Sequence, residues 1–308
     1  MVRSSIAAVL AFSFLLGGCK GRQPAADHPA YDRSPVATNA IVQYSLGVPA
    51  IRHVRSLWDR YSELTQVLNN SGTGFVLKLE SGQTADSYDT KLRGGLFDFA
   101  IVDPYQVLVA EDRGYSVIAR TGKPDRIRGV IVIARDSEIR GVRDLRTRTI
   151  AFTNPTALAA TLLNQYDLFE SGLDVRKRAV VVYTHSPETS LLSVALNRAS
   201  AAAVSEADWD EFQQDHPDSA KALSRLRQTE ALSGPAVMAS PRIPPDHVRR
   251  LQAALLQLAS EANGRAALER AGISGFRPGN SVSYDDVWDF LQRYKQALGP
   301  LPDRIPWR

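Results

Sequence analysis

Polar side chains follow several apolar, β-branched runs of this sequence, at the points where the predicted strands end. Asp103 and Tyr105 follow one run, Thr156 follows another, and Glu206 follows a third. In open α/β sheets, ligands bind beyond the carboxyl ends of strands, often at helix N-termini. We therefore predict a small-molecule binding site at these loops. The candidate ligand-binding residues taken from the strand ends are Tyr44, Ser45, Tyr88, Asp89, Asp103, Tyr105, Thr156, Thr184, His185, Thr189, Ser190 and Glu206.

Four of these residues also fit purely structural roles. Tyr44 fits an ordinary core position, and Asp89 fits a helix cap. Thr156 fits a cap as well, and Asp103, which precedes a proline, fits a turn. The polar loop over residues 184–190 favours a site instead, because so many donors gather at one strand end, and its histidine would be pH-sensitive if buried near a ligand.

Four carboxylates follow the strand predicted to end near residue 204. Glu206, Asp208, Asp210 and Glu211 would occupy the first turn of a helix, where acidic side chains suit the helix dipole. Among them, we expect only Glu206, nearest the strand end, to reach a pocket.

The signatures of common enzymes are absent from the sequence. It has no Gly-x-Ser-x-Gly elbow, no Walker phosphate loop and no His-Glu-x-x-His motif, and its five histidines lack metal-ligand spacing. We find no nucleophile–base pairing, so we expect no catalysis, no metal and no cofactor. The net charge of +4 is too small to indicate a nucleic-acid partner.

Short apolar runs alternate with helical patterns, which predicts an α/β fold with parallel sheets covered on both faces. The continuous runs Val130 to Ile133 and Val180 to Val182 are typical of doubly covered strands. Helices are predicted over 52–68, 156–169 and 248–259, and from residue 283 or 285 onward. Strands are predicted over 40–46, 75–79, 97–102, 115–119, 129–134, 149–153, 179–183, 201–204 and 236–239.

The N-terminus predicts export. Arg3 precedes an apolar run from Ile6 to Leu16, which is shorter than the roughly 20 residues that span a bilayer, and Leu16-Gly17-Gly18-Cys19 follows. This pattern resembles the bacterial lipobox, whose cysteine is acylated and becomes the new N-terminus. We therefore expect a signal peptide over 1–18, a lipid on Cys19 and a flexible tether over 19–38. The protein would lie in the periplasm, or on the outer face of a single-membrane cell.

A series of short segments occurs in a fixed order along the middle of the chain. These are Ser87-Tyr88-Asp89, Leu92 to Ala100, Asp103-Pro104-Tyr105, Gly129 to Val132, Asp144-Leu145-Arg146 and Ala151 to Ala160. Together, over about Ile41 to Ser205, they resemble the phosphonate/phosphate/phosphite-binding proteins of ABC importers.

The resemblance implies a type II periplasmic-binding-protein fold, with two α/β lobes, two crossing strands and the ligand in the interlobe cleft. Residues 39–122 and 239–308 would form the first lobe and 123–238 the second, with crossings near 122–129 and 229–239. The partners implied are a small anionic ligand and an ABC transporter permease. A sensory lipoprotein that signals to a membrane kinase is the alternative, because it needs the same closing cleft.

The resemblance also implies an anion site at a helix N-terminus. In the family a Ser-Thr-Ser-Gly-like run holds the phosphonate oxygens, and the corresponding residues here are Ala157, Leu158, Ala159 and Ala160. Their main-chain amides can bind an anion, whereas the hydroxyls are absent apart from that of Thr156. Leu158 would add an apolar wall. The expected ligand is of the phosphonate, phosphate or phosphite class, with a carboxylate or sulfonate as the alternative.

Overall fold

The computed structural model describes residues 41–49, 54–122 and 125–301. The expected signal peptide, Cys19 and the tether lie outside the described residues. The described residues belong to one unit of contacts. Within the described residues, no helix is long and apolar enough to cross a membrane.

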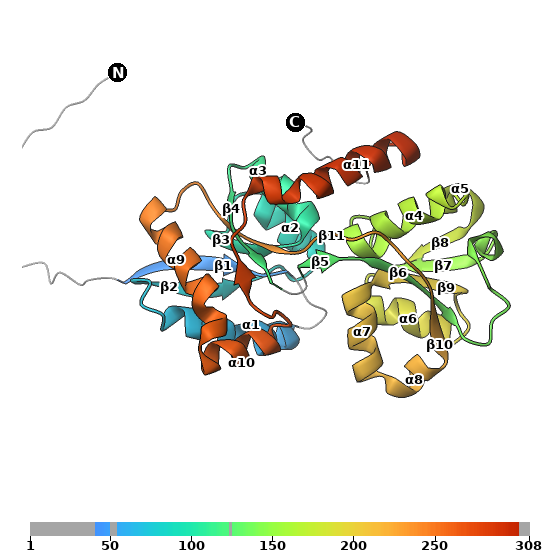
Figure 1. Cartoon of the computed structure of the whole chain (residues 1–308), viewed down its shortest axis with the longest axis horizontal. Helices are drawn as coiled ribbons and strands as arrows, with labels where there is room; N and C mark the ends of the chain where they lie inside the picture. The colour runs from blue at the N-terminus through green and yellow to red at the C-terminus, as the bar shows by residue number, and fades with distance from the viewer. Residues whose placement is uncertain (1–40, 50–53, 123–124, 302–308) are drawn as a thin grey trace, which may run out of the picture. The chain divides into compact units, whose positions relative to one another are not determined.

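A six-stranded mixed sheet forms the first lobe (Figure 1). Its strands occur in the order β13-β4-β12-β3-β1-β2, and β1 pairs in parallel with both β2 and β3. β3 is buried along its whole length, as its unbroken apolar sequence predicts. The strands are β1 (Val42–Gly47), β2 (Phe75–Glu80), β3 (Phe99–Val102), β4 (Ser116–Thr121), β12 (Ala236–Ala239) and β13 (Phe276–Arg277).

A five-stranded sheet forms the second lobe, in the order β10-β6-β9-β7-β8. β7 pairs in parallel with β8 and β9, whereas β6 is antiparallel to both β9 and β10. The carboxyl end of β9 therefore lies beside the start of β6, where Ser205 pairs with Gly129. The strands are β6 (Gly129–Ala134), β7 (Thr149–Phe152), β8 (Val180–Tyr183), β9 (Ala201–Ser205) and β10 (Leu223–Gln228).

Two short antiparallel strands connect the lobes. β5 (Arg126–Ile127) leads from the first sheet to the second, and β11 (Leu232–Ser233) leads back. Both fall within the segments expected to cross. The expected second lobe, residues 123–238, would include most of β12. In the structure β12 pairs with β3 and β4 and so belongs to the first sheet. The chain thus re-enters the first lobe immediately after β11, because β12 completes the centre of that sheet.

Two helices of the first lobe begin with recognisable start signals, whereas the N-cap residues Pro244, Glu261 and Tyr284 of three others make no side-chain cap. Thr84 caps α2 through a reciprocal bond with Ser87, and Asp103 with Pro104 opens α3. The helices of this lobe are α1 (Val54–Asn69), α2 (Ala85–Arg93), α3 (Pro104–Glu111), α9 (Pro245–Gln257), α10 (Ala262–Arg270) and α11 (Asp285–Leu298), with the 3₁₀ turns η3 (Leu258–Ser260) and η4 (Ser281–Tyr284).

The second lobe has shorter helices. One of them begins as a π-helical turn, η2 (Leu158–Leu163), and continues directly as α4 (Asn164–Glu170). Gly172 follows with a φ of 87°, the left-handed conformation that commonly ends a helix. The remaining elements are α5 (Val175–Arg178), α6 (Pro187–Ala195), α7 (Glu206–Asp215), α8 (Pro217–Lys221) and the 3₁₀ turn η1 (Val142–Leu145).

Helix α11 packs on both lobes. It contacts α3 of the first lobe and α4 of the second, as Figure 1 shows along the top of the view. The hydroxyl of Tyr294 donates to Oε1 of Gln165 at 2.6 Å, and Phe290 lies edge-on to Tyr166. One hydrophobic cluster therefore runs from α2 and α3 through α11 to η2.

Most predicted elements are confirmed, but two expectations were wrong. Both sheets are mixed rather than parallel. β8 is not covered on both faces, because Val180 and Val182 are exposed on the last strand of its sheet. All nine predicted strands are present with ends within two residues, and the helix expected over 156–169 spans 158–170. The prediction missed the four strands β5, β10, β11 and β13. Three of these are only two residues long, and the sequence of β10 is interrupted by Ser224, Arg225 and Arg227.

Candidate ligand-binding site

The helix formed by η2 and α4 begins with unpaired main-chain amides. The amides of Thr161 and Leu162 both donate to the carbonyl of Ala157, at 2.9 and 3.0 Å, which makes the first turn wide. Among the described residues, no acceptor receives a hydrogen bond from the amides of Leu158, Ala159 or Ala160. Ala157 occupies the N-cap position and has no side-chain oxygen to bond them. All three residues are buried, so their amides require a partner.

A buried hydroxyl lies in the loop that leads into this helix. Thr153 follows β7 directly, is 4% exposed, and its Oγ1 has no hydrogen-bond partner among the described residues. Its carbonyl accepts the amide of His185 at 2.7 Å, so the loops after β7 and β8 lie side by side. His185 adopts a φ of 59°, an uncommon conformation for a residue with a side chain. Unpaired donors and a constrained backbone thus occur together at the carboxyl edge of this sheet.

Carboxylates from both lobes influence one another at the junction between them. Asp103, at the start of α3, is accessible to solvent, but the surrounding protein desolvates its carboxylate and so raises its pKa to about 6. The negative charges of Asp208 in α7 and, after it, Asp89 in α2 raise this pKa as well. Burial also raises the pKa of Asp208, although hydrogen bonds from Ser205 oppose that shift. Gln106 bonds the main-chain amide of Asp103 and the carboxylate of Asp89. These neighbouring carboxylates therefore disfavour the binding of a further negatively charged group at this part of the junction.

Replacing Asp103 with asparagine is expected to stabilise the protein more at pH 8 than at pH 5. The raised pKa means that the folded state holds the proton more tightly than the unfolded chain does, so ionisation between about pH 4 and 7 costs stability. Asparagine has no charge to desolvate and can still cap α3. Melting temperatures of the two proteins across this range test the prediction, and a difference that does not change with pH would contradict it.

One ion pair joins the two lobes at the same junction. Arg60 of α1 contacts Glu211 of α7 with 2.8 Å between Nη2 and Oε1. Both side chains are partly exposed, so the pair contributes little to stability. Arg60 was not among the candidates, because no motif surrounds it in the sequence. Asp208 and Glu211 were expected to be acids of a helical first turn. Asp208 is one, as the N3 residue of a capping box, whereas Glu211 lies beyond the first turn of α7.

Tyr44 and Ser45 lie away from this junction. The hydroxyl of Tyr44 is 2.8 Å from Nδ1 of His247 in α9, and its ring contacts Phe75 and Phe99 at the amino ends of β2 and β3. Ser45 binds the carboxylate of Asp98, the residue before β3. Both side chains therefore sit toward the amino edge of the parallel strands, opposite the expected ligand.

Three further candidates belong to the hydrophobic core. Tyr88 is 1% exposed and donates to the carbonyl of Ile101 at 2.6 Å, and Tyr105 is buried in the same cluster. The side chain of Leu158 packs in this cluster as well, so it forms no open apolar wall. Its amide, together with those of Ala159 and Ala160, remains in the candidate site.

Several polar groups of the loop after β8 form hydrogen bonds with one another. The hydroxyls of Thr184 and Ser190 are 2.7 Å apart, and Ser190 is fully buried. Thr189 is exposed, and its amide donates to Oγ of Ser186. His185 is exposed, and its amide bonds the carbonyl of Thr153 in the loop that leads to the unpaired amides.

Thr156 and Glu206 have partners in their own surroundings. Asn154 Oδ1 accepts from both the amide and the hydroxyl of Thr156, so Thr156 does not cap the helix. Glu206 accepts hydrogen bonds from Arg225 and Gln228 of β10.

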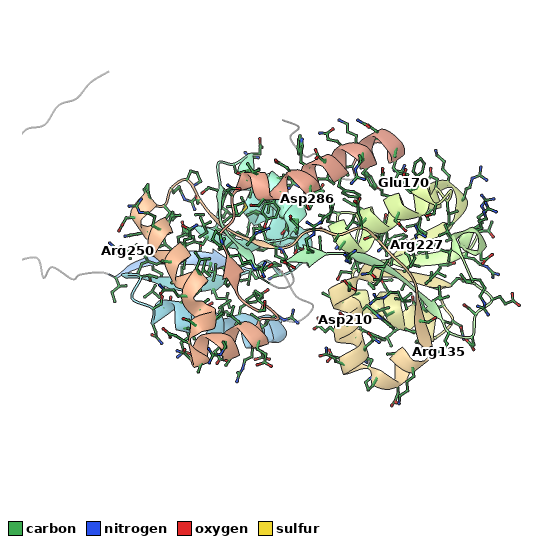
Figure 2. All side chains as sticks on the ribbon, in the orientation of Figure 1. Arg135, Glu170, Asp210, Arg227, Arg250 and Asp286 are labelled. Atoms are coloured by element: carbon green, nitrogen blue, oxygen red, sulfur yellow. The ribbon has the colours of Figure 1, made fainter. Side chains whose placement is uncertain are left out.

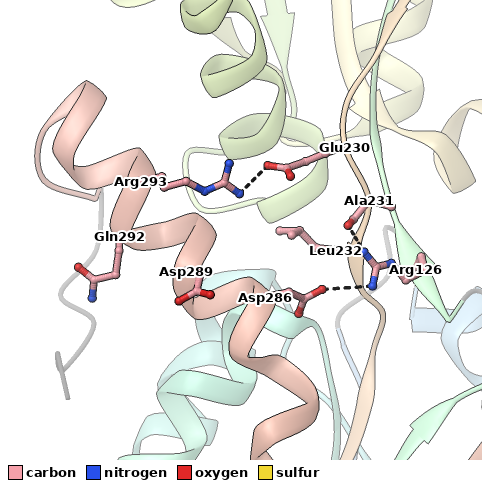
Figure 3. A pocket seen from close by; sticks show the side chains of 8 residues that line it. All are labelled: Arg126, Glu230, Ala231, Leu232, Asp286, Asp289, Gln292 and Arg293. Atoms are coloured by element: carbon pink, nitrogen blue, oxygen red, sulfur yellow. Dashed lines mark hydrogen bonds and ion pairs between the residues drawn. The ribbon is translucent and has the colours of Figure 1, made fainter.

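A cavity of about 560 Å³ lies elsewhere, between the crossing strands and α11 (Figure 3). Its charged groups are mostly paired with one another: Arg293 contacts Glu230 at 2.8 Å, and Arg126 contacts Asp286 at 3.4 Å. Because these charged side chains already have partners, the cavity is a weaker candidate for a ligand site than the helix N-terminus, whose amides have none. In the part of the chain that the structure describes, no group of three or more His, Cys, Asp or Glu side chains could hold a metal.

The comparison with protein families now identifies the class of this chain. Residues 46–284 match the family of phosphonate periplasmic substrate-binding proteins of ABC transporters. The match covers most of the chain, so the protein belongs to this family. The family is one of extracytoplasmic substrate-binding proteins, which work with a membrane permease. No protein of curated function matches the sequence.

Solved structures share the fold. PhnD1 from Prochlorococcus marinus, in complex with methylphosphonate, superposes with a TM-score of 0.74 at 14% identity, covering 82% of this chain and 98% of that one. A binding-protein component of an ABC phosphonate transporter from Pseudomonas aeruginosa gives 0.72 at 14% identity, with 83% and 88% covered. A Xanthomonas citri protein bound to chloride gives 0.70 at 21% identity, with 82% and 99% covered. The fold is therefore that of the type II periplasmic binding proteins.

Proposed function

We propose that this chain is the substrate-binding component of an ABC importer and captures a small anion of the phosphonate, phosphate or phosphite class without catalysing a reaction. The observation that carries the proposal is the set of unpaired amides of Leu158, Ala159 and Ala160. A helix N-terminus attracts negative charge through its free amides and its dipole, and hydrogen bonds to a charged group contribute about 1.5–3 kcal/mol each. The hydroxyl of Thr153 and the side chain of His185 are the neighbouring groups that we assign to the ligand.

The carboxylates at the junction support a narrower ligand class. Asp89, Asp103 and Asp208 would repel an anion with charge at both ends. A ligand with an acidic group at the helix and a hydrogen-bond donor or positive charge at its other end suits both features. We therefore place an aminoalkylphosphonate ahead of a simple phosphonate, and small carboxylates and sulfonates behind them.

A thermal-shift screen tests this function. Phosphate, phosphite, methylphosphonate, 2-aminoethylphosphonate, an alkanesulfonate and small carboxylates would each be added to the protein. A specific ligand stabilises the folded state by about 2.7 kcal/mol at a hundredfold excess over its dissociation constant. We expect the phosphonates to raise the melting temperature most. If none of the phosphorus-containing anions shifts the melting temperature while a carboxylate or sulfonate does, the assigned ligand class is wrong.

We also propose that the chain is held at a membrane through a lipid on Cys19, with residues 19–38 as the tether. The proposal rests on the sequence Leu16-Gly17-Gly18-Cys19 and on the extracytoplasmic location of the family. The Cys19→Ala variant is expected to leave the membrane fraction, because the thiol that carries the lipid is lost. Fractionation of cells and mass spectrometry of the mature N-terminus check this, and an unmodified Cys19 in the parent would contradict it.

A further inference from the structure

Basic residues precede each of the three parallel strands of the second lobe. Arg146 and Arg148 come just before β7, Arg178 comes before β8, and Arg198 comes before β9. All four are exposed, as is Arg143 in the η1 turn that leads to β7. Parallel strands place their amino ends at one edge of the sheet, so the three loops should lie together.

Main-chain hydrogen bonds confirm that these loops adjoin one another. The amide of Thr147 donates to the carbonyl of Arg178 at 2.7 Å, and the amide of Val180 donates to that of Arg148 at 2.9 Å. The amide of Ser200 donates to the carbonyl of Thr149 at 2.8 Å, which brings in the third loop. We call the surface formed by Arg143, Arg146, Arg148, Arg178 and Arg198 the basic edge.

The side chains of the basic edge have no anionic partner within the protein. In the described part of the chain, none of the five guanidinium groups forms an ion pair or a hydrogen bond. The nearby acids are used elsewhere: Asp144 accepts main-chain amides of Arg140 and Gly141, and Asp174 pairs with Arg176 and Lys177. Figure 2 shows nitrogen-tipped side chains gathered on this side of the second lobe, near α5. The charge of the edge is thus free for an external anion.

Aliphatic side chains are exposed among these arginines. Val180 and Val182 are 52% and 43% exposed on one face of β8, which is the last strand of its sheet. Leu196 is 59% exposed and comes two residues before Arg198. Arginines together with exposed aliphatic groups suit a surface that offers phosphates and an apolar layer beneath them.

The basic edge lies opposite the candidate ligand site. The unpaired amides of η2 and the hydroxyl of Thr153 are at the carboxyl ends of β7 and β8, whereas the basic edge is at the amino ends of the same strands. A partner on the basic edge would therefore leave the ligand site open.

We propose that the basic edge rests on the anionic phospholipid surface of a membrane. The guanidinium fork matches phosphate geometry, and clusters of four to eight basic residues near a bilayer bind anionic lipids at about 1 kcal/mol per residue. The extracytoplasmic location of the family makes a bilayer the phosphate-dense surface that the protein meets. Lipids move laterally, so they can match arginines that are spread over three loops. This inference does not depend on which ligand the protein binds or on the lipid at Cys19.

Vesicle sedimentation of the chain from Lys20 onward tests the inference without an anchor. All four hydrophobic clusters lie within residues 46–301, so this chain retains the whole described core. We expect it to bind vesicles of phosphatidylcholine mixed with phosphatidylglycerol and not vesicles of phosphatidylcholine alone. High salt should release it, because the screening length falls from about 10 Å at 0.1 M to about 3 Å at 1 M.

Two charge-reversal variants of equal net charge distinguish binding through the basic edge from an effect of the overall charge of the protein. The triple variant Arg146→Glu, Arg148→Glu, Arg178→Glu is expected to lose vesicle affinity by more than about 100-fold, because each reversal removes a contact and adds repulsion. The control variant Lys78→Glu, Arg113→Glu, Arg249→Glu changes the net charge equally at exposed sites of the first lobe and should bind like the parent. Leu196→Ser should weaken binding less than the triple variant does.

Three results would overturn the inference. Equal binding to neutral vesicles would remove the role of lipid charge, and equal losses in the two triple variants would reduce the effect to net charge. Binding to polyglutamate in the absence of vesicle binding would assign the basic edge to an acidic protein. Circular dichroism of both variants establishes that any loss occurs in folded protein.

Discussion

Replacing Ala157 with aspartate is expected to stabilise the unliganded protein and to abolish its anion binding. Ala157 occupies the N-cap of η2 with no side-chain hydrogen bond, and the amides of Leu158, Ala159 and Ala160 have no partner. An aspartate there would bond the free amides and add a negative charge where the ligand binds. An acidic N-cap in place of alanine stabilises a protein by about 0.5–2 kcal/mol. The melting temperature should rise by about 2–4 °C for each kcal/mol of this stabilisation.

The same substitution should weaken anion affinity by more than about 100-fold, since charge-assisted hydrogen bonds of roughly 1.5–3 kcal/mol each become unavailable. Isothermal titration with the ligand identified in the thermal-shift screen measures this loss. Glu261→Asp is a matched control, because Glu261 occupies the N-cap of α10 and also lacks a side-chain cap. It should leave ligand affinity unchanged. Parental affinity in Ala157→Asp would show that the anion does not bind at this helix.

Truncating Phe290 to alanine is expected to lower the free energy of unfolding by about 3–5 kcal/mol. The ring is fully buried in the cluster that links the lobes, and it lies 5.5 Å from the ring of Tyr166 in α4, between ring centroids. Its loss leaves a cavity where α11 packs on the second lobe. Urea denaturation measures the effect.

Val282→Ala serves as the control for this truncation. Val282 is 70% exposed in the turn just before α11, and its loss should change the unfolding free energy by less than about 0.5 kcal/mol. Similar effects of the two substitutions would mean that α11 does not hold the lobes together.

The architecture was predictable because its strongest signals are local. The runs Gly129–Ala134 and Ala236–Ala239 were predicted with the strand ends that the structure has, since an unbroken apolar run of this length fits a buried strand and is too short for a typical helix. The two-residue strands β5 and β11 were located only as crossing segments. Their pairing joins Ile127 to Leu232, more than a hundred residues apart, and no local pattern specifies it.

The candidate site was only partly predictable. The run Ala157-Leu158-Ala159-Ala160 offers no side-chain cap, so unpaired amides follow from the sequence once a helix is predicted there. The assignment of Tyr88 was less secure, because a phenol can be buried when its hydroxyl finds a carbonyl, here that of Ile101. Such a partner is visible only in three dimensions.

Contacts between the lobes were beyond sequence reasoning. Arg60 forms an ion pair with Glu211 across the junction. The raised pKa of Asp103 could not be predicted either, because it depends partly on the charge of Asp208, more than a hundred residues away in the chain. Each of these residues occurs in an ordinary helical context, which is why a capping or solvent-exposed role fits it equally well. Long-range pairing of this kind depends on how both lobes pack against the crossing strands and α11.

A crystal structure of the protein with bound methylphosphonate tests the central claim most directly. We predict that the phosphonate oxygens lie within about 2.7–3.2 Å of the amide nitrogens of Leu158, Ala159 and Ala160, with the hydroxyl of Thr153 donating to the same group. A phosphonate bound at another place, with these amides left to water, would contradict the account.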